Sequence, residues 1–270
     1  MNIITAYFKR LIIPALFFII SYIIVYGLVL GYLKGDIIYE TKSLAIETLY
    51  GVISSGSMSN IPCWFLISLF FARIILDVIL SFSRTIQLVI SLILAVSIFV
   101  VHYPFYITQS FLAMPFCFAG LCMSDYVKNL KPTSYDNMSL IIVFIILALL
   151  DVGITYYNGR VSMTSLYFGT HGRILGFPLF YINGLIGTAG LIVLSLILSK
   201  REFKVVGTIS NAMITIICFQ WFLIVPYVHF THYIYNNLIP LIYTAIVFMT
   251  SYLIYRALKR VSPVLVGEMK

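Results

Sequence analysis

The stretch Cys63–Leu80 reads CWFLISLFFARIILDVIL, and it is apolar enough to cross a lipid bilayer although it contains Arg73 and Asp77. Similar apolar runs recur along the chain. Of its 270 residues, 61% are hydrophobic and 10% are charged, whereas a soluble domain has roughly 25% charged residues. So few charges cannot cover a surface that faces water. The sequence therefore predicts an integral membrane protein, and the length of its apolar runs favours helices over barrel strands.

About eight runs approach the length of a membrane-spanning helix, which is roughly 17–25 residues. They cover residues 11–32, 62–82, 86–101, 105–127, 139–157, 175–198, 208–228 and 238–258. The first run follows Lys9 and Arg10, as the core of a secretory signal would. It is too long for such a core and no cleavage site follows it, so we expect it to be retained. The predicted fold is an all-α polytopic helix bundle that forms one domain over residues 1–270.

Basic residues indicate how the bundle is oriented. Most of the 17 Lys and Arg residues fall at the termini and in every second connection between the runs. They are Lys9, Arg10, Arg84, Lys128, Lys131, Lys200, Arg201, Lys204, Arg256, Lys259, Arg260 and Lys270. Cytoplasmic loops of membrane proteins carry the excess of Lys and Arg. Both termini are thus predicted to be cytoplasmic, and the net charge of +8 reflects topology rather than a nucleic-acid partner.

Arg73 and Asp77 are four residues apart in the second run, so they share one helix face and can form an ion pair. A charge at the centre of a bilayer costs about 2.5–3.5 kcal/mol, which disfavours a solitary position facing lipid. Two interpretations stay open. The two residues hold helices together, or they line a polar cavity that meets a charged substrate.

The loop NGRVSMTSLYFGTHGR, residues 158–173, carries Arg160, His171 and Arg173 on the predicted outer side, where positive charge is otherwise avoided. Asp151 lies shortly before it, toward the outer end of the fifth run. One interpretation is a solvated loop that touches lipid phosphates. The other is a basic mouth over a cavity for an anionic or sugar-phosphate substrate.

The sequence also excludes several functional classes. It has no phosphate-binding Walker loop, no dinucleotide fingerprint and no G-x-S-x-G nucleophile motif. Cys117 and Cys122 have a spacing that fits no usual zinc site, and no His lies near them, so no metal site is predicted.

Four stretches together resemble the acyltransferase-3 family of bacterial membrane acyltransferases. They are FKRLIIPALFF at residues 8–18, WFLISLFFARIIL at 64–76, LAMPFCFAGLCM at 112–123 and ISNAMITIICFQ at 209–220. The resemblance implies an inner-membrane enzyme that moves an acyl group, usually acetyl, from acyl-CoA to a sugar hydroxyl of a surface polysaccharide or its lipid-linked precursor. Acyl-CoA is then a co-substrate, and no bound cofactor is implied.

The resemblance also suggests roles for individual residues. Lys9 and Arg10 match the basic pair that precedes the family's Pro-containing helix, and they are candidates for contacting CoA, although they can equally be topology anchors. Trp64 opens the family's Trp-Phe-Leu segment and is a candidate for lining the acceptor path. Gln220 stands where members often have His, and a neutral amide can hold a hydroxyl but cannot act as a base.

One departure from the family's pattern leaves the catalytic residues unidentified. Family members generally begin with two further helices that carry the catalytic His, whereas only eight residues precede Lys9 here. We therefore expect a chain that lacks the family's first helices, with catalytic residues that cannot be named. Two other functions remain as alternatives: a polysaccharide polymerase or flippase, and a non-catalytic membrane partner in a glycan-synthesis complex.

Overall fold

The structure is a computed structural model that describes residues 3–56, 61–130, 136–163, 165–199, 212–223 and 238–268. These residues are almost entirely helical, apart from one short two-stranded hairpin. The helices gather into two compact units, each described by itself below. Unit 1 comprises Met1–Val78, Val101–Ser110 and Val205–Lys270, and unit 2 comprises Ile79–Val100 and Phe111–Lys204.

The N-terminal helix of unit 1 is continuous from Ile3 to Lys34. It consists of α1 (Ile3–Tyr7), the π-helical turn η1 (Phe8–Ile12) and α2 (Ile13–Lys34). The wide turn comes directly before Pro14, which has no backbone N–H to donate. The helix therefore begins eight residues before the predicted apolar run, at residue 3 rather than 11.

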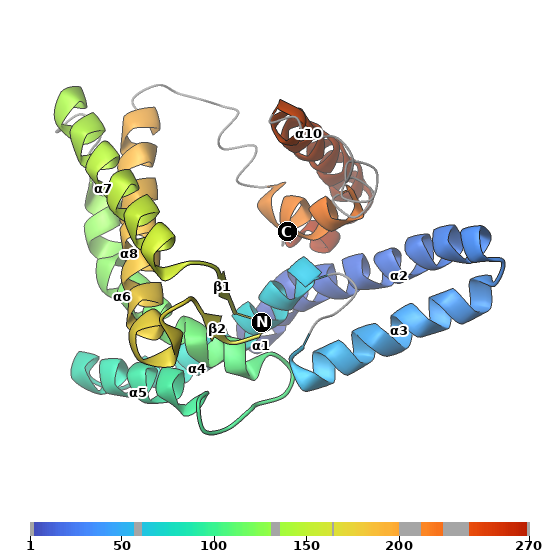
Figure 1. The fold of residues 1–270 in the computed structure, drawn as a ribbon, viewed down its shortest axis with the longest axis horizontal. Coiled ribbons are helices and arrows are strands. Elements are labelled where there is room, and N and C mark those ends of the chain that lie inside the picture. Colours follow the sequence, from blue (N-terminus) through green and yellow to red (C-terminus); the bar gives the residue numbers. More distant parts are fainter. Residues whose placement is uncertain are drawn as a thin grey trace. The chain divides into compact units, whose positions relative to one another are not determined.

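Helix α3 (Ile37–Ser54) follows after a tight turn and runs back beside α2 (Figure 1). Gly35, at φ 85°, ends α2 in the left-handed conformation, and the Asp36 carboxylate caps α3 by accepting a bond from the Tyr39 N–H. A Cβ on Gly31 would overlap the Cα of Ile37, so glycine is what allows the close approach. This helix was not predicted from sequence, because its charged residues interrupt the apolar pattern without disfavouring a helix.

The core of unit 1 forms where α2 meets α4 (Trp64–Ile79), which follows the short turn η2 (Ile61–Cys63). Its buried members are Leu11, Ala15, Phe18, Ile19, Cys63, Leu66, Tyr106 and Cys218. Cys218 comes from the short helix Ala212–Leu223, which is also tied to α2 because the Tyr26 hydroxyl donates to the Phe222 carbonyl at 3.0 Å. Apolar packing thus joins the first and last thirds of the chain.

The last described residues fold back onto the same unit. Helix α10 (Leu238–Val261) is followed by the turn η4 (Pro263–Val266), and Glu268 accepts bonds from the Tyr255 hydroxyl at 2.5 Å and from Lys259 Nζ at 2.8 Å. The bond to Glu268 raises the pKa of Lys259. Burial opposes ionisation of Glu268, but the bonds from Lys259 and Tyr255 outweigh it and lower the pKa of this carboxyl group.

Unit 2 contains α5 (Arg84–Ser97), most of α6 (Ile107–Asn129), α7 (Asn137–Asn158) and α8 (Gly172–Ser199). Helices α7 and α8 lie side by side along much of their length (Figure 1). The hairpin of β1 (Val161–Ser162) and β2 (Tyr167–Phe168) connects them, with Val161 opposite Phe168. Phe side chains from the segment after α5, from β2 and from α8 pack together at this hairpin: Phe99, Phe168 and Phe177.

Four helices in the described part of the chain are long and apolar enough to cross a membrane: Ile3–Lys34, Ile107–Asn129, Asn137–Asn158 and Gly172–Leu198. The all-helical membrane fold is thereby confirmed. Helix α5 has 14 residues, or about 21 Å at about 1.5 Å each, which is short of a hydrocarbon layer of about 30 Å. The total of eight spans and the cytoplasmic termini stay predictions, and of the run 208–228 the structure describes only residues 212–223.

Candidate functional site

A column of polar side chains runs between α7 and α8. Asp151, Thr155 and Asn158 are four and three residues apart, so they share one face of α7. From α8, Asn183 Nδ2 donates to Thr155 Oγ1 at 3.0 Å. We call these four residues the polar seam. It lies within two helices that are otherwise long and apolar enough to span a bilayer.

The Asp151 carboxylate lies close to a glycine of α8. A Cβ added to Gly187 of α8 would stand 3.1 Å from Asp151 Oδ1, so the carboxylate lies directly against the α8 backbone. Asp151 is seven residues from the end of α7, or about 10 Å along the helix axis. An ionisable group at such a depth costs about 2.5–3.5 kcal/mol and is rarely retained without a function.

A cavity of about 400 Å³ opens at the Asn158 end of the seam. Its lining includes Thr155, Asn158 and Asn183 of the seam together with Arg160 from the following loop. The remaining lining residues are Ile154, Gly159, Val161, Met163, Phe180 and Gly184. Carboxamides, a hydroxyl and a guanidinium thus meet at one cavity with an apolar floor, which is a common composition for a small-molecule site.

Two carboxamide oxygens at this cavity, Asn158 Oδ1 and Asn183 Oδ1, are buried and accept no hydrogen bond within the described residues. A buried acceptor without a donor costs about 1–3 kcal/mol. The two differ in their surroundings. Asn158 Oδ1 lies against Gly169 and Gly176, where an added Cβ would come within 2.6 and 3.2 Å of it, so this side chain is wedged in place. No glycine contact of that kind is recorded for Asn183, whose oxygen is the better candidate for a ligand hydroxyl.

Of the three basic residues predicted to form an outer mouth, only Arg160 lines this cavity. The His171 ring instead stacks on Tyr157, with the ring centroids 4.2 Å apart, and its Nε2 lies 3.0 Å from the Tyr157 carbonyl oxygen. Arg173 lies over the ring of Phe99 at 5.4 Å. The seam residues Thr155, Asn158 and Asn183 were missed from sequence, because single polar residues in apolar runs follow no motif.

In unit 1, Arg73 and Asp77 do not form the ion pair that their spacing allows; the ion pairs of the described residues lie elsewhere. Both meet Tyr7 of α1 instead. The guanidinium lies 5.3 Å from the centre of the Tyr7 ring, and the Tyr7 hydroxyl donates to Asp77 Oδ1 over a long 3.4 Å. Asp77 Oδ2 is buried and has no partner within the described residues. Tyr7 therefore stands between the two charges and ties α4 to the N-terminal helix.

The other predicted site residues also lie in unit 1. Lys9 and Arg10 are exposed on η1, just after Tyr7, so they lie at the same end of unit 1 as Arg73. The half-buried Trp64 packs beside Tyr106 in the core, with the rings 6.2 Å apart. Gln220 is half-buried on the helix Ala212–Leu223. Of these four residues, Lys9 and Arg10 are the exposed ones, so they can contact a soluble anionic ligand.

The described residues contain no group of three or more His, Cys, Asp or Glu side chains that could hold a metal ion. A comparison with protein-family models, characterised proteins and solved structures finds no match to this chain. The resemblance to the acyltransferase-3 family therefore stays a prediction from four motifs. The class of protein that the fold defines is a helical membrane protein, and its function has to be argued from the polar seam.

The two carboxamides should respond differently to substitution by Leu, which is similar in size but apolar. Asn183→Leu removes an unpaired buried oxygen and leaves Thr155, which is exposed and can bond to water, so thermal stability in detergent should stay equal or rise. Asn158→Leu, the matched control, places a branched side chain against Gly169 and Gly176 and should lower stability by about 1–3 kcal/mol. A large loss of stability in Asn183→Leu alone would show that Asn183 is a structural residue.

The linkage through Tyr7 predicts a specific pattern in double-mutant cycles of thermal unfolding. Arg73→Ala and Tyr7→Ala should couple by about 0.5–1 kcal/mol, because Arg73 is exposed and a cation–aromatic contact at an exposed site is worth about that much. Tyr7→Phe should keep this coupling while losing the bond to Asp77. A coupling between Arg73 and Asp77 that survives in the Tyr7→Ala background would instead show a direct ion pair.

Proposed function

We propose that this protein is a membrane O-acyltransferase of the bacterial inner membrane. It moves an acyl group, acetyl in the simplest case, from acyl-CoA to a sugar hydroxyl of a cell-surface polysaccharide or its precursor. Two lines support the proposal: the four motifs that resemble acyltransferase-3 enzymes, and the polar seam with its cavity. The observation that carries it is Asp151, a carboxylate held between two membrane-length helices one helical turn from a cavity that contains an unpaired acceptor.

The seam has the groups that a hydroxyl acceptor requires. A sugar presents several O–H donors, and the free oxygen of Asn183 can accept one of them while the Arg160 guanidinium donates to a sugar oxygen. Arg160 also suits a phosphate on the sugar, because a guanidinium can make two parallel bonds to it. The apolar floor formed by Phe180 and Met163 can pack on the faces of the ring.

Asp151 is our candidate for the general base. As the acceptor oxygen attacks the thioester carbonyl, the carboxylate takes the hydroxyl proton, a C–O bond forms, and the C–S bond breaks as the CoA thiolate leaves. The thiolate then takes up a proton, so atoms and charge balance. A positioned base of this kind typically contributes 10²–10⁴-fold in rate. In the proposal Asp151 thus takes the role of the family's catalytic His.

The donor would be bound elsewhere. Lys9, Arg10 and Arg73 are the candidates for the CoA phosphates, and the charge distribution predicts that their end of the N-terminal helix is cytoplasmic. The same rule predicts that the cavity lies toward the outer side. In the proposal the acyl-CoA thioester has to reach the polar seam intact, because the sugar oxygen attacks its carbonyl there.

Glycan translocation is the second candidate, since unpaired polar groups inside membrane helices also suit a permeation path for a hydroxylated substrate. The two functions differ in their need for acyl-CoA. Translocation requires none, whereas acyl transfer consumes one molecule per acylated hydroxyl.

Transfer of radiolabelled acetyl from acetyl-CoA to glycan should be measured in membranes that contain the protein at matched levels. Asp151→Asn should lower kcat by about 10²–10⁴-fold and leave KM for acetyl-CoA unchanged. Lys9→Ala combined with Arg10→Ala should raise that KM, because the cations bind the phosphates. Gly153→Leu, on the same helix with open space at its Cβ, is the control and should retain activity. Glycan export without incorporation of label would favour translocation and contradict the proposal.

A further inference from the structure

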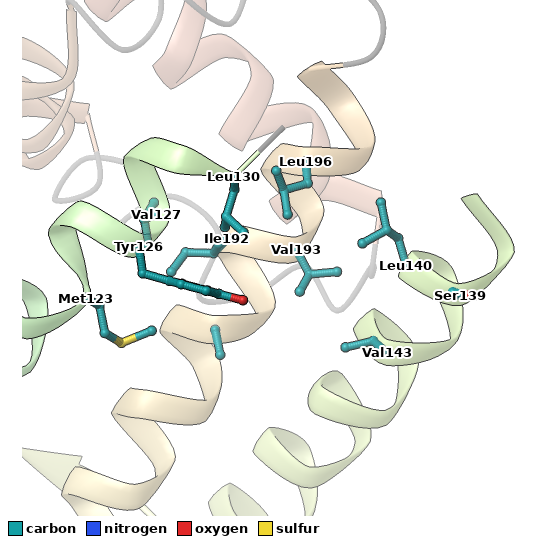
Figure 2. Close-up of a pocket in the computed structure, with 11 residues that line it drawn as sticks. Met123, Tyr126, Val127, Leu130, Ser139, Leu140, Val143, Ile192, Val193 and Leu196 are labelled. Atoms are coloured by element: carbon teal, nitrogen blue, oxygen red, sulfur yellow. The ribbon is translucent and has the colours of Figure 1, made fainter. Parts of the chain in front are cut away.

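A second, apolar site lies between α6 and the two helices that carry the polar seam, α7 and α8. Two cavities of about 830 Å³ and 300 Å³ share Met123 and Val127 of α6 and Ala189 and Ile192 of α8. Figure 2 shows the smaller one, with side chains of α6, α7 and α8 extending into the space between the helices. Met123 is 41% exposed, so the space is open at the surface rather than enclosed. We call the two connected cavities the α6–α8 groove.

The groove is closed at one end by an aromatic contact. The centre of the Phe116 ring on α6 lies 5.4 Å from that of Phe180 and 4.9 Å from that of Tyr181, both on α8. The same ring packs against Gly184. The Tyr181 hydroxyl donates to the Leu112 carbonyl at 2.7 Å, which fixes α6 to α8 at this end. The contact separates the groove from the polar cavity, which begins at Asn183 and Gly184.

The other end of the groove carries a cation, Lys128. From Phe116 to Lys128, α6 rises by about 18 Å at about 1.5 Å per residue, which is close to one leaflet of a hydrocarbon layer of about 30 Å. Lys128 Nζ lies 3.9 Å from Asp125 Oδ1, but both side chains are largely exposed and such a pair contributes little. The amine is therefore available to an anion at the membrane surface.

We propose that the α6–α8 groove binds one hydrocarbon chain of a membrane phospholipid whose anionic head group is held by Lys128. Within a bilayer the hydrophobic effect does not select a chain, because the alternative surroundings are equally apolar. Selectivity comes from close packing along α6 and α8 and from the charge of Lys128, which reaches the head-group layer as lysines near helix ends do. The proposal does not depend on acyl transfer.

The chain itself offers a matched pair of variants for the test. The Cβ positions of Gly120 on α6 and Gly153 on α7 both have no atom within 4 Å, so either glycine accepts a side chain without moving the backbone. Gly120 lines the groove and Gly153 does not. Gly120→Leu therefore fills the groove, and Gly153→Leu adds the same side chain elsewhere on the helices.

The protein should be placed in nanodiscs of phosphatidylcholine that contain a small share of phosphatidic acid with a photoreactive diazirine in its acyl chain. After illumination, crosslinks should concentrate on Met123, Val127, Ala189 and Ile192 and should be competed by unlabelled phosphatidic acid. Gly120→Leu should reduce them to the level of the other lipid-facing residues, while Gly153→Leu should leave them unchanged. Equal crosslinking in the two Gly variants, or crosslinks from one copy of the chain to another, would overturn the proposal.

The head-group contact is tested by the charge at position 128. Lys128→Ala should reduce groove labelling by phosphatidic acid about fivefold, as expected for one basic residue near an anionic surface, while labelling by the phosphatidylcholine analogue stays the same. Lys128→Arg should keep the preference for the anionic lipid. An equal loss for both lipids in Lys128→Ala would show that the groove does not select an anionic head group.

Discussion

Hydrocarbon cannot supply hydrogen bonds, so each polar group that enters the membrane has to find its partner inside the protein. This constraint explains why α7 and α8 lie together. Asp151 avoids lipid because Gly187 lets the α8 backbone come close to the carboxylate, and Thr155 is met by Asn183. The partners are incomplete, however, since the Asn183 oxygen accepts nothing within the described residues. The seam is thus stabilised by helix packing and remains able to bind a ligand that brings its own donors.

The polar cavity and the α6–α8 groove have different chemistry, and Phe116 separates them. On one side, Asn183 and Arg160 line a polar cavity of about 400 Å³; on the other, α6 and α8 line an open apolar groove. The Phe116 ring fits against Gly184 between them. One set of helices therefore presents a site for a hydroxylated head and a site for a hydrocarbon chain.

The parts of the fold that could be predicted are the long apolar helices, because a segment inside a membrane has to be apolar along its whole length. Runs 139–157 and 175–198 lie within α7 and α8 because an uninterrupted apolar run has few other conformations in a bilayer. Helix α3 was missed because its charged residues are typical of a loop between membrane spans, although Asp36 caps the helix. Arg160, one of the three residues offered for a basic mouth, lines a cavity, whereas His171 and Arg173 contact Tyr157 and Phe99. Those two contacts arise only when the hairpin folds. Asn183 could not be predicted from the sequence, because what distinguishes it is that its side-chain oxygen accepts no hydrogen bond within the described residues.

The central claim is that α7 and α8 enclose a polar, water-accessible cavity within membrane-length helices, and cysteine accessibility tests it most directly. With Cys63, Cys117, Cys122 and Cys218 replaced by Ala, single cysteines should be placed at Thr155, in the seam, and at Leu149, which is 67% exposed on the same helix. The cysteine thiolate, which forms in water but not in lipid, attacks a charged thiol reagent. We predict rapid modification of Thr155→Cys in intact membranes, slowed by a bound sugar, and no modification of Leu149→Cys. Equal reactivity at the two positions would contradict the account.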